Sequence, residues 1–320
     1  MKRIAVMTSG GDSPGMNAAI RSVVRTGIAN DIEVFGIEQG YKGIIQDKMR
    51  LLESKDVSNT IYRGGTFLRS ARCLEFKTKE GREKGVQNLK KHDIEALVVI
   101  GGDGSLTGAK VLEDEYGYKV IGIPGSIDND IYGTNISIGV DTALNNIIHA
   151  IDTINDTASS HDRTFMVEVM GRNCGYLALT AAIAGGAEAA LIPEIPFDLE
   201  SILEKIRKRY EEGKTRSIIL IAEGVGSAHD FGKTLQMMGG FDTRIMVLGH
   251  LQRGGSPTVF DRMLATRMGA AAVEGLMEGK TGVMTALVNK NIEFIPFEEV
   301  LGNTRQLDER LMKIAEDLSH

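Results

Sequence analysis

The stretch ALVVIGGDGS, residues 96–105, decides the fold of this chain. Five apolar residues are followed by two glycines, an aspartate, a further glycine and a serine. A continuous apolar run of this length is typical of a strand buried on both faces, which is the habit of parallel sheets covered by helices. The residues after Ser105 then follow a helical pattern, so the stretch predicts a strand, a glycine-rich turn and a helix.

The same strand-to-loop pattern recurs along the chain. Strands are predicted at residues 4–7, 96–100, 120–123, 165–170, 218–222 and 245–248, and helices at residues 17–25, 105–115, 142–155, 175–184, 199–212 and 256–278. Strands that alternate with helices favour a doubly wound α/β fold, in which ligands bind at the carboxyl ends of the strands. Those ends carry the Gly, Asp, Arg and Glu residues of this chain.

Length and composition limit the classes of protein to which the chain can belong. The 320 residues predict about two domains, and the 38 glycines exceed the usual ~7% of a sequence. A hydrophobic content of 42% excludes disorder, and a net charge of −6 argues against a general nucleic-acid or anionic-membrane surface. Two cysteines and the lack of a signal-peptide core predict a cytoplasmic protein. The apolar stretch 177–192 holds two glycines and a glutamate, so no membrane span is expected there.

Several common signatures are absent from the sequence. It has no G-x-G-x-x-G followed by an acidic residue about 20 positions later, no G-x-x-x-x-G-K-[ST] and no G-x-S-x-G. A nicotinamide dehydrogenase, a P-loop nucleotide hydrolase and an α/β-hydrolase are therefore disfavoured. The six histidines show no zinc-binding spacing.

Two glycine-rich loops predict phosphate binding. In the loop at 101–105, backbone N–H groups can approach phosphate oxygens, and we expect Ser105 to cap the following helix and Asp103 to hold magnesium. The loop at residues 10–15 could bind phosphate in the same way at another strand end. The alternative is a pair of tight turns that need glycine only for a positive φ.

A third loop, at residues 124–130, carries two carboxylates and a hydroxyl. If its backbone is extended, Ser126, Asp128 and Asp130 share one face and point into one cleft. A carboxylate there could take a proton from an alcohol during phosphoryl transfer. The alternative is a turn rich in Asp and Asn.

Anion binding in a negatively charged chain requires a local group of cations. Five arginines lie near glycines or strand ends, and the planar guanidinium suits phosphate. They are Arg72, Arg163, Arg172, Arg244 and Arg253. Taken singly, each is better explained by a surface ion pair.

Six motifs in order make the chain resemble the bacterial ATP-dependent 6-phosphofructokinases from end to end. They are TSGGDSPGMN at 8–17, GGDGS at 101–105, PGSIDND at 124–130, MGR at 170–172, AEG at 222–224 and LGHLQRGGSP at 248–257. The resemblance implies transfer of the γ-phosphoryl group of ATP to the 1-hydroxyl of fructose 6-phosphate, with Mg²⁺. This is the committed step of glycolysis.

The resemblance also assigns site residues. Asp128 matches the general base, and Arg72, Arg172 and Ser126 match the other catalytic positions. The implied ATP-binding residues are Gly11, Arg72, Cys73, Gly102, Asp103, Gly104 and Ser105, with Asp103 at the metal. The implied sugar-phosphate residues are Ser126, Ile127, Asp128, Arg163, Met170, Gly171, Arg172, Glu223, Arg244, His250, Leu251, Gln252 and Arg253.

The resemblance further implies two Rossmann-like lobes with mostly parallel sheets and the active site in the cleft between them. The larger, ATP-binding lobe would comprise residues 1–139 and 252–302, and the smaller, fructose 6-phosphate-binding lobe 140–251 and 303–320. Arg163 and Arg244 match residues that the family extends to a neighbouring subunit, which implies a homotetramer with shared active sites. Nucleic acid and membrane are not expected partners.

Two glycines bear on the phosphoryl donor. Gly104 and Gly125 stand where pyrophosphate-dependent relatives commonly carry Asp and Lys, so the sequence favours ATP. A pyrophosphate-dependent phosphofructokinase is the near alternative, and a non-catalytic nucleotide-binding regulator is the distant one. More generally, we expect the glycines at the strand ends, Gly101 and Gly224 among them, to leave space for phosphate or magnesium.

Departures from the family pattern concern its allosteric site for ADP and phosphoenolpyruvate. The implied effector residues are Arg21, Arg25, Asn155, Gly186, Ala187, Glu188, Glu212 and Lys214. Asn155 and Glu212 stand where basic residues are expected. Because a neutral and an acidic side chain replace two cations, we expect a weak or altered effector response.

Overall fold

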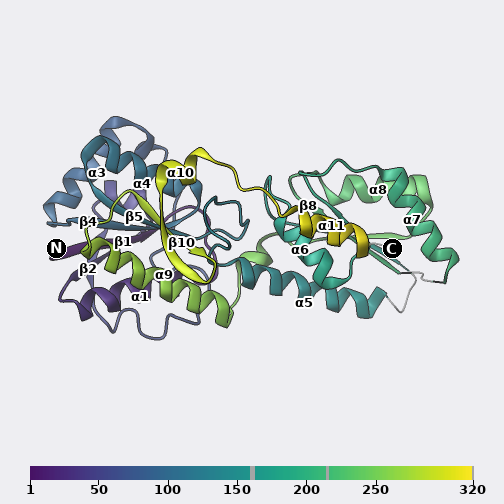
Figure 1. Ribbon diagram of the computed structural model, residues 1–320, viewed down its shortest axis with the longest axis horizontal. Helices are drawn as coiled ribbons and strands as arrows, with labels where there is room; N and C mark the ends of the chain where they lie inside the picture. Colours follow the sequence, from purple (N-terminus) through teal and green to yellow (C-terminus); the bar gives the residue numbers. More distant parts are fainter. Residues whose placement is uncertain (159–162, 214–215, 319–320) are drawn as a thin grey trace. The chain divides into compact units, whose positions relative to one another are not determined.

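The computed structural model describes residues 1–158, 163–213 and 216–318, and in these residues the strands form two separate sheets. Contacts divide the chain into two units that interleave in sequence. Unit 1 comprises Met1–Ile127, Ile131–Thr142 and Arg253–Arg305, and unit 2 comprises Asp128–Asp130, Ala143–Gln252 and Gln306–His320. Figure 1 labels many of the helices and strands of the two units.

Unit 1 contains a seven-stranded sheet in the order β11-β10-β5-β4-β1-β2-β3. The strands are β1 (Arg3–Thr8), β2 (Glu33–Ile37), β3 (Met49–Leu52), β4 (Ala96–Gly101), β5 (Lys119–Pro124), β10 (Val283–Val288) and β11 (Asn291–Pro296). The five central strands pair in parallel, whereas β3 and β11 pair antiparallel at the two edges.

Helices cover both faces of this sheet. One face packs on α1 (Met16–Ala29) and α9 (Val259–Met277) through residues such as Val23 and Ala265. The other face packs on α2 (Tyr41–Ile45), α3 (Lys79–Lys91), α4 (Asp103–Tyr116) and α10 (Phe297–Gly302), with Leu89 and Leu106 buried. Figure 1 shows α1 and α9 on the opposite side of the strands from α3 and α4. A short 3₁₀ helix, η1 (Glu75–Lys77), precedes α3.

Unit 2 contains a four-stranded, wholly parallel sheet in the order β7-β8-β6-β9. The strands are β6 (Thr164–Val169), β7 (Ala189–Leu191), β8 (Ser217–Ala222) and β9 (Thr243–Val247). The helices are α5 (Val140–Ala158), which starts in unit 1, α6 (Tyr176–Gly185), α7 (Leu199–Glu211), α8 (Ala228–Gly239) and α11 (Glu309–Leu318), with the 3₁₀ helix η2 (Gly249–Arg253).

The predicted α/β class with mostly parallel sheets is confirmed, and so are the six predicted strands and six predicted helices to within a few residues. The apolar face predicted for residues 199–212 is confirmed too, because Leu203 and Ile206 are buried against the sheet of unit 2. No helix among the described residues is both long and apolar enough to span a membrane.

Candidate active site

Three loops of unit 1 come together at the carboxyl edge of its sheet. They follow β1, β4 and β5, which are neighbours, so parallel pairing places their ends side by side. The Ser9 N–H donates to the Ile100 carbonyl at 3.0 Å, and the Gly125 N–H donates to the Gly101 carbonyl at 3.0 Å. The loops at 10–15, 101–105 and 124–126 therefore form one continuous surface of backbone.

The helix α4 begins two residues earlier than the sequence predicts, at Asp103. Gly102 is its N-cap and offers no side-chain acceptor, so the prediction that Ser105 caps this helix is wrong. Ser105 is buried in the first turn, where its N–H donates to the Gly102 carbonyl at 2.8 Å and its carbonyl accepts from the Tyr41 hydroxyl. The N-terminus of α4 presents the positive end of the helix dipole beside the exposed side chain of Asp103.

The glycines at the strand ends serve two different purposes. A Cβ on Gly101 would clash with the Ser9 carbonyl, and one on Gly224 would clash with the Arg172 carbonyl. The expectation that these glycines leave space for phosphate is therefore wrong, because neighbouring backbone fills that space. A Cβ on Gly104 or Gly249, in contrast, meets no protein atom within 4 Å.

The remaining ATP-site predictions fall on the surface of unit 1. Arg72 is exposed in the segment between β3 and η1, and Cys73 is half-buried against the core under α3 and α4. Arg253 belongs to unit 1, although it was predicted among the sugar-phosphate residues. Its Nη1 donates to the Asp12 carbonyl at 3.0 Å, and its guanidinium occupies the space beside Gly11.

In unit 2, the site centres on a buried carboxylate and an exposed guanidinium. The Asp128 side chain is only 3% exposed, and its Oδ2 lies 3.4 Å from Arg172 Nε. The Arg172 side chain is 66% exposed, so it is accessible to a ligand. The two side chains form an ion pair in which the carboxylate is buried and the arginine side chain is exposed to solvent.

A strained turn aims Arg172. It follows β6, with φ of 133° at Gly171 and 52° at Arg172, and the left-handed region is costly for an arginine. Contacts compensate this cost, because the Arg172 N–H donates to Glu223 Oε1 at 2.9 Å and the Cys174 N–H donates to the Gly171 carbonyl at 2.8 Å. Glu223 directly follows β8, the neighbour of β6.

Gln252 connects the β6 loop to the β9 loop. Its side chain is fully buried; Oε1 accepts from the Met170 N–H at 3.1 Å and Nε2 donates to the Gly249 carbonyl at 3.0 Å. Both ends of the amide are therefore used inside unit 2, and the side chain holds two loops together. The contact of Gln252 with substrate stays a prediction. His250 and Leu251, from the same turn, are exposed.

The loop at 124–130 is not extended beyond Gly125. The chain bends at Ile127 and Asp128, and Asn129 has φ of 54°. Strict alternation of side chains therefore fails, and the prediction that Ser126, Asp128 and Asp130 share a face by alternation is wrong. The reason is that Asp and Asn readily form turns, which was the alternative interpretation of this loop. Ser126 is half-buried, whereas Ile127 is buried.

Arg163 and Arg244 lie at the opposite edge of the sheet of unit 2. Arg163 precedes β6, and Arg244 is the second residue of β9. Both guanidinium groups lie 3.1 Å from the same oxygen, Asp242 Oδ2. Because a six-residue strand spans about 20 Å, these arginines are remote from Asp128 and Arg172 within one chain.

Three of the predicted effector residues line one polar pocket of about 210 Å³ in unit 2. They are Asn155, Gly186 and Glu188, and the wall is completed by Gly185, Arg209, Arg216, Ser217 and Ile218. Burial raises the pKa of Glu188, while the Ile218 N–H and Arg209 oppose that rise. Arg209 and Arg216 were not predicted, because they belong to no motif.

The other effector predictions lie elsewhere. Ala187 and Glu212 do not line that pocket, and Lys214 lies outside the described residues. Arg21 and Arg25 lie one turn apart on α1 in unit 1, where partial burial and the neighbouring Arg25 lower the pKa of Arg21.

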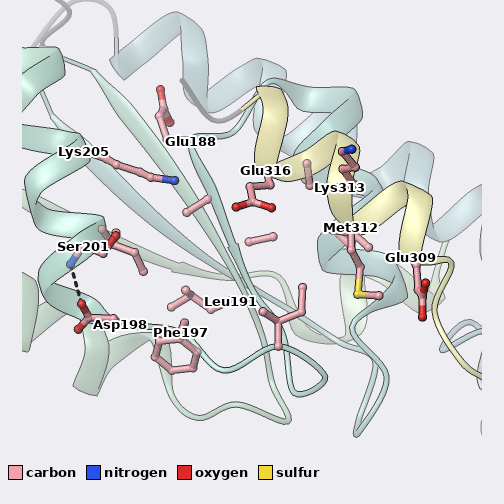
Figure 2. Close-up of a pocket in the computed structure, with 16 residues that line it drawn as sticks. Glu188, Leu191, Phe197, Asp198, Ser201, Lys205, Glu309, Met312, Lys313 and Glu316 are labelled. Carbon is pink, nitrogen blue, oxygen red and sulfur yellow. Dashed lines mark hydrogen bonds between the residues drawn. The ribbon is translucent and has the colours of Figure 1, made fainter.

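A larger hollow of about 590 Å³ lies between α7 and α11, over β7 (Figure 2). Small and apolar side chains such as Ala190, Leu191 and Met312 line it together with charged ones such as Lys205 and Lys313. Glu188 belongs to this hollow as well as to the polar pocket.

A metal at Asp103 would depend on the phosphates of its ligand. Among the described residues there is no group of three His, Cys, Asp or Glu side chains that could hold an ion. Magnesium commonly binds proteins through one or two carboxylates and takes its other ligands from phosphates and water. A single exposed carboxylate at a helix N-terminus, beside the open space at Gly104, fits such an ion.

The fold and the site define a class. An α/β protein with glycine loops and a helix N-terminus in one unit, and a carboxylate paired with arginine in the other, has the parts of a phosphotransferase that acts on an alcohol. Comparison with known proteins then gives the family. The phosphofructokinase family profile matches residues 3–276, and the chain belongs to that family.

Individual relatives agree with this assignment. The chain is 54% identical over 319 residues to the ATP-dependent 6-phosphofructokinase of Bacillus licheniformis, covering 100% of both chains. Its structure resembles phosphofructokinase from Saccharomyces cerevisiae, with a TM-score of 0.89, 38% identity, and coverage of 100% of this chain and 48% of that one. A pyrophosphate-dependent phosphofructokinase from Marinobacter aquaeolei has a TM-score of 0.88 at 23% identity, covering 99% of this chain and 91% of that one, which shows the fold alone.

Proposed function

We propose that this chain transfers the γ-phosphoryl group of ATP to the 1-hydroxyl of fructose 6-phosphate, with Asp128 as the general base. The observation that carries the proposal is the ion pair between the buried Asp128 carboxylate and Arg172, 3.4 Å apart. An alcohol placed against the Asp128 carboxylate can pass its proton to it as the alcohol oxygen bonds to the γ-phosphorus and the bond from that phosphorus to ADP breaks. The exposed side chain of Arg172 is then available for the charge of the transferring group.

Each unit supplies one half of the binding residues. Unit 1, the ATP-binding lobe in this proposal, offers the N–H groups of α4 and of the loop at 10–15 to the phosphates. Asp103 would hold Mg²⁺, which when bound neutralises charge on the β- and γ-phosphates. Unit 2, the sugar-phosphate lobe, offers Arg172, Glu223 and His250 at the carboxyl edge of its sheet.

ATP rather than pyrophosphate is the proposed donor. The open space at Gly104 accommodates the larger donor, and the identity of 54% is to an ATP-dependent relative. At Gly125, a Cβ would lie 3.1 Å from Met16 Cε and 3.4 Å from Ser13 Oγ, so a lysine side chain would be crowded there. The likeness to a pyrophosphate-dependent structure does not bear on the donor, because both classes share this fold.

One assay tests this function. The purified protein is given fructose 6-phosphate with Mg²⁺ and either ATP or pyrophosphate, and formation of fructose 1,6-bisphosphate is followed. We expect turnover with ATP and little with pyrophosphate. Turnover with pyrophosphate alone would establish the alternative donor, and no product with either donor would favour the non-catalytic regulator.

The proposed assembly is a homotetramer in which Arg163 and Arg244 serve the active site of a neighbouring subunit. Their place at the amino edge of the sheet supports this, because an arginine there cannot reach the Asp128 carboxylate of its own chain. Mixing Arg244→Ala subunits with Asp128→Asn subunits tests it: shared sites restore activity, whereas self-contained sites leave every subunit defective.

The proposed regulation is a weak or altered response to ADP and phosphoenolpyruvate. Asn155 lines the polar pocket without contributing a charge, as the sequence analysis expected. The double change Asn155→Arg with Glu212→Lys should strengthen the response, and Asn155→Arg alone should provide most of the gain, since Glu212 does not line the pocket. In the unchanged protein, a sigmoidal dependence of rate on fructose 6-phosphate that phosphoenolpyruvate shifts strongly and ADP restores would contradict the proposal.

A further inference from the structure

A long irregular segment of unit 1 contains Arg72. Residues 53–74 connect β3 to η1, and the structure describes all of them without a helix or a strand. Loops longer than about 15 residues that lack secondary structure are uncommon in compact domains, where they are usually functional or disordered. Buried side chains from other elements of unit 1 hold this segment in one place.

Asn17 binds the middle of the segment. It is the second residue of α1 and is only 2% exposed. Its Nδ2 donates to the carbonyls of Arg63 at 3.1 Å and Gly64 at 3.2 Å, and its Oδ1 accepts from the Phe67 N–H at 2.9 Å. Both N–H groups of the amide and its carbonyl oxygen are therefore used on one loop. Because three backbone groups are bound at once, this loop has a fixed position against α1.

Thr8 binds the residues that follow. It is the last residue of β1 and is fully buried. Its Oγ1 donates to the Arg69 carbonyl at 3.0 Å and lies 2.8 Å from Thr66 Oγ1. The Thr8 hydroxyl has a single proton, which goes to the carbonyl, so the Thr66 hydroxyl is the donor in the second bond. The side chain of β1 thus continues the anchoring that α1 begins.

These contacts end two residues before Arg72. The Ser70 hydroxyl donates to the carbonyl of Gly10, the residue that begins the glycine loop at 10–15. The exposed guanidinium of Arg72 forms no hydrogen bond or ion pair with the residues that the structure describes. Its reach is therefore set by where its backbone is held, and the backbone is held against a loop that is proposed to bind phosphate.

We propose that Asn17 and Thr8 are positioning residues for phosphoryl transfer. They fix the segment at 63–70 and so hold Arg72 beside the phosphates. The inference rests on the proposed function and adds two residues that do not touch the substrates, because both are buried. A guanidinium stabilises the transferring group only from a defined position, and a displacement of about 1 Å can cost about a hundredfold in rate.

A double-mutant cycle with Arg72 tests the inference. Asn17→Ala should lower kcat about ten- to a hundredfold and change KM less, because the misplaced guanidinium is lost mainly to the transition state. In the Arg72→Ala protein, the same change should lower kcat by less than about twofold, since no guanidinium is left to position. Losses that multiply would show that Asn17 acts independently of Arg72, and the inference would be wrong.

A matched control separates positioning from stability. Ser22 lies on the same helix and is 5% exposed, and its hydroxyl donates to the Thr266 carbonyl of α9 at 2.6 Å. Ser22→Ala also removes a buried hydrogen bond of α1, but none to the segment. It should lower the free energy of unfolding in chemical denaturation and leave kcat unchanged. An equal fall of kcat in Ser22→Ala and Asn17→Ala would reflect lost stability and overturn the inference.

Thr8 keeps the inference testable if Asn17→Ala does not fold. Thr8→Val preserves the shape of the side chain but removes the bond to the Arg69 carbonyl, so kcat should fall about two- to tenfold, the worth of a neutral hydrogen bond. Thr8→Ser keeps the hydroxyl and should retain most of kcat. If Thr8→Val and Thr8→Ser have the same kcat, the hydroxyl does not position Arg72.

Hydrogen exchange measures the segment itself. Backbone N–H groups in peptides covering residues 63–72 should exchange faster in Asn17→Ala and Thr8→Val than in the unchanged protein, because the segment loses bonds that hold it. Ser22→Ala should exchange there as the unchanged protein does. Equal exchange in all four proteins would contradict the inference.

Failure of this inference can be told apart from failure of the proposed function. If the unchanged protein does not turn over fructose 6-phosphate with ATP, the proposed reaction is overturned, and the exchange experiment still decides whether Asn17 holds the segment. If the unchanged protein turns over and Asn17→Ala has the same kcat, the inference alone is overturned.

Discussion

The carboxyl edges of the two sheets are built differently. In unit 1 the edge consists of backbone, with glycine loops after β1, β4 and β5 and the N-terminus of α4. In unit 2 it consists of side chains, with Asp128, Arg172, Glu223 and Gln252 tied to one another or to neighbouring backbone. Backbone N–H groups can bind phosphate whatever molecule carries it, whereas side chains that contact one another fix the position of one reacting group.

The largest expected effect breaks the side-chain edge. Asp128→Asn keeps the shape of the residue but removes its ability to accept a proton, so kcat should fall by about 10²–10⁴. Binding of fructose 6-phosphate should be largely kept, as measured by KM and by direct titration. Asp230→Asn, an exposed change on α8, serves as the control. Near-normal turnover of Asp128→Asn would exclude the residue as the base.

Unit 1 has one buried carboxylate of its own beneath its backbone loops. Asp261 on α9 accepts from the N–H groups of Gly139 and Thr142 at 2.9 and 2.8 Å and from the Thr142 hydroxyl, at the start of α5. Burial is the main cause that raises the pKa of Asp261 to about 6. The folded protein therefore binds this proton more tightly than the unfolded chain does.

The stabilising contribution of Asp261 should therefore decrease as the pH rises. The contribution of Asp261 to stability is fully present below its unfolded pKa of about 4 and is lost as pH rises through about 6. Its size is about 3 kcal/mol. Chemical denaturation between pH 4 and 7 should show this slope in the unchanged protein and not in Asp261→Asn. The exposed Asp31→Asn should retain it, and a slope that survives in Asp261→Asn would assign the titration to another group.

A smaller effect sharpens the comparison at Gln252. Gln252→Leu leaves the Met170 N–H and the Gly249 carbonyl without their partner, so the free energy of unfolding should fall by about 2 kcal/mol. Since the change loosens the turn that aims Arg172, kcat should fall more than KM changes. Gln236→Leu on the surface of α8 is the control. A change in KM alone would instead favour direct contact of Gln252 with substrate.

The sequence predicted the deeply buried strands well and missed several that are partly exposed. β4 and β8 are buried throughout, so their apolar runs are continuous and readable. β11 is buried on one side at most, and β2 is interrupted by Gly36; neither shows such a run. The order of the seven strands depends on pairings between distant segments, which no local pattern records.

The site was predicted in a similarly uneven way. Glycine loops are visible in the sequence because few other functions cluster glycine at strand ends, although Gly101 and Gly224 turned out to serve packing. Arg209 and Arg216 were missed because a helix and a strand from separate segments bring them to one pocket. The burial of Gln252 and its hydrogen bonds to two loops appear only in the fold.

The smallest expected effect tests whether the backbone edge of unit 1 is kept bare for a ligand. A Cβ at Gly104 meets no protein atom, and alanine is a better helix former than glycine by about 0.5–1 kcal/mol. Gly104→Ala should therefore raise the free energy of unfolding by up to that amount and also raise KM for ATP. Gly104→Asp should raise KM for ATP further. Gly302 in α10 is equally open, so Gly302→Ala should leave KM unchanged. If Gly104→Ala and Gly302→Ala behave alike in both measurements, the open space at Gly104 is not occupied by the nucleotide.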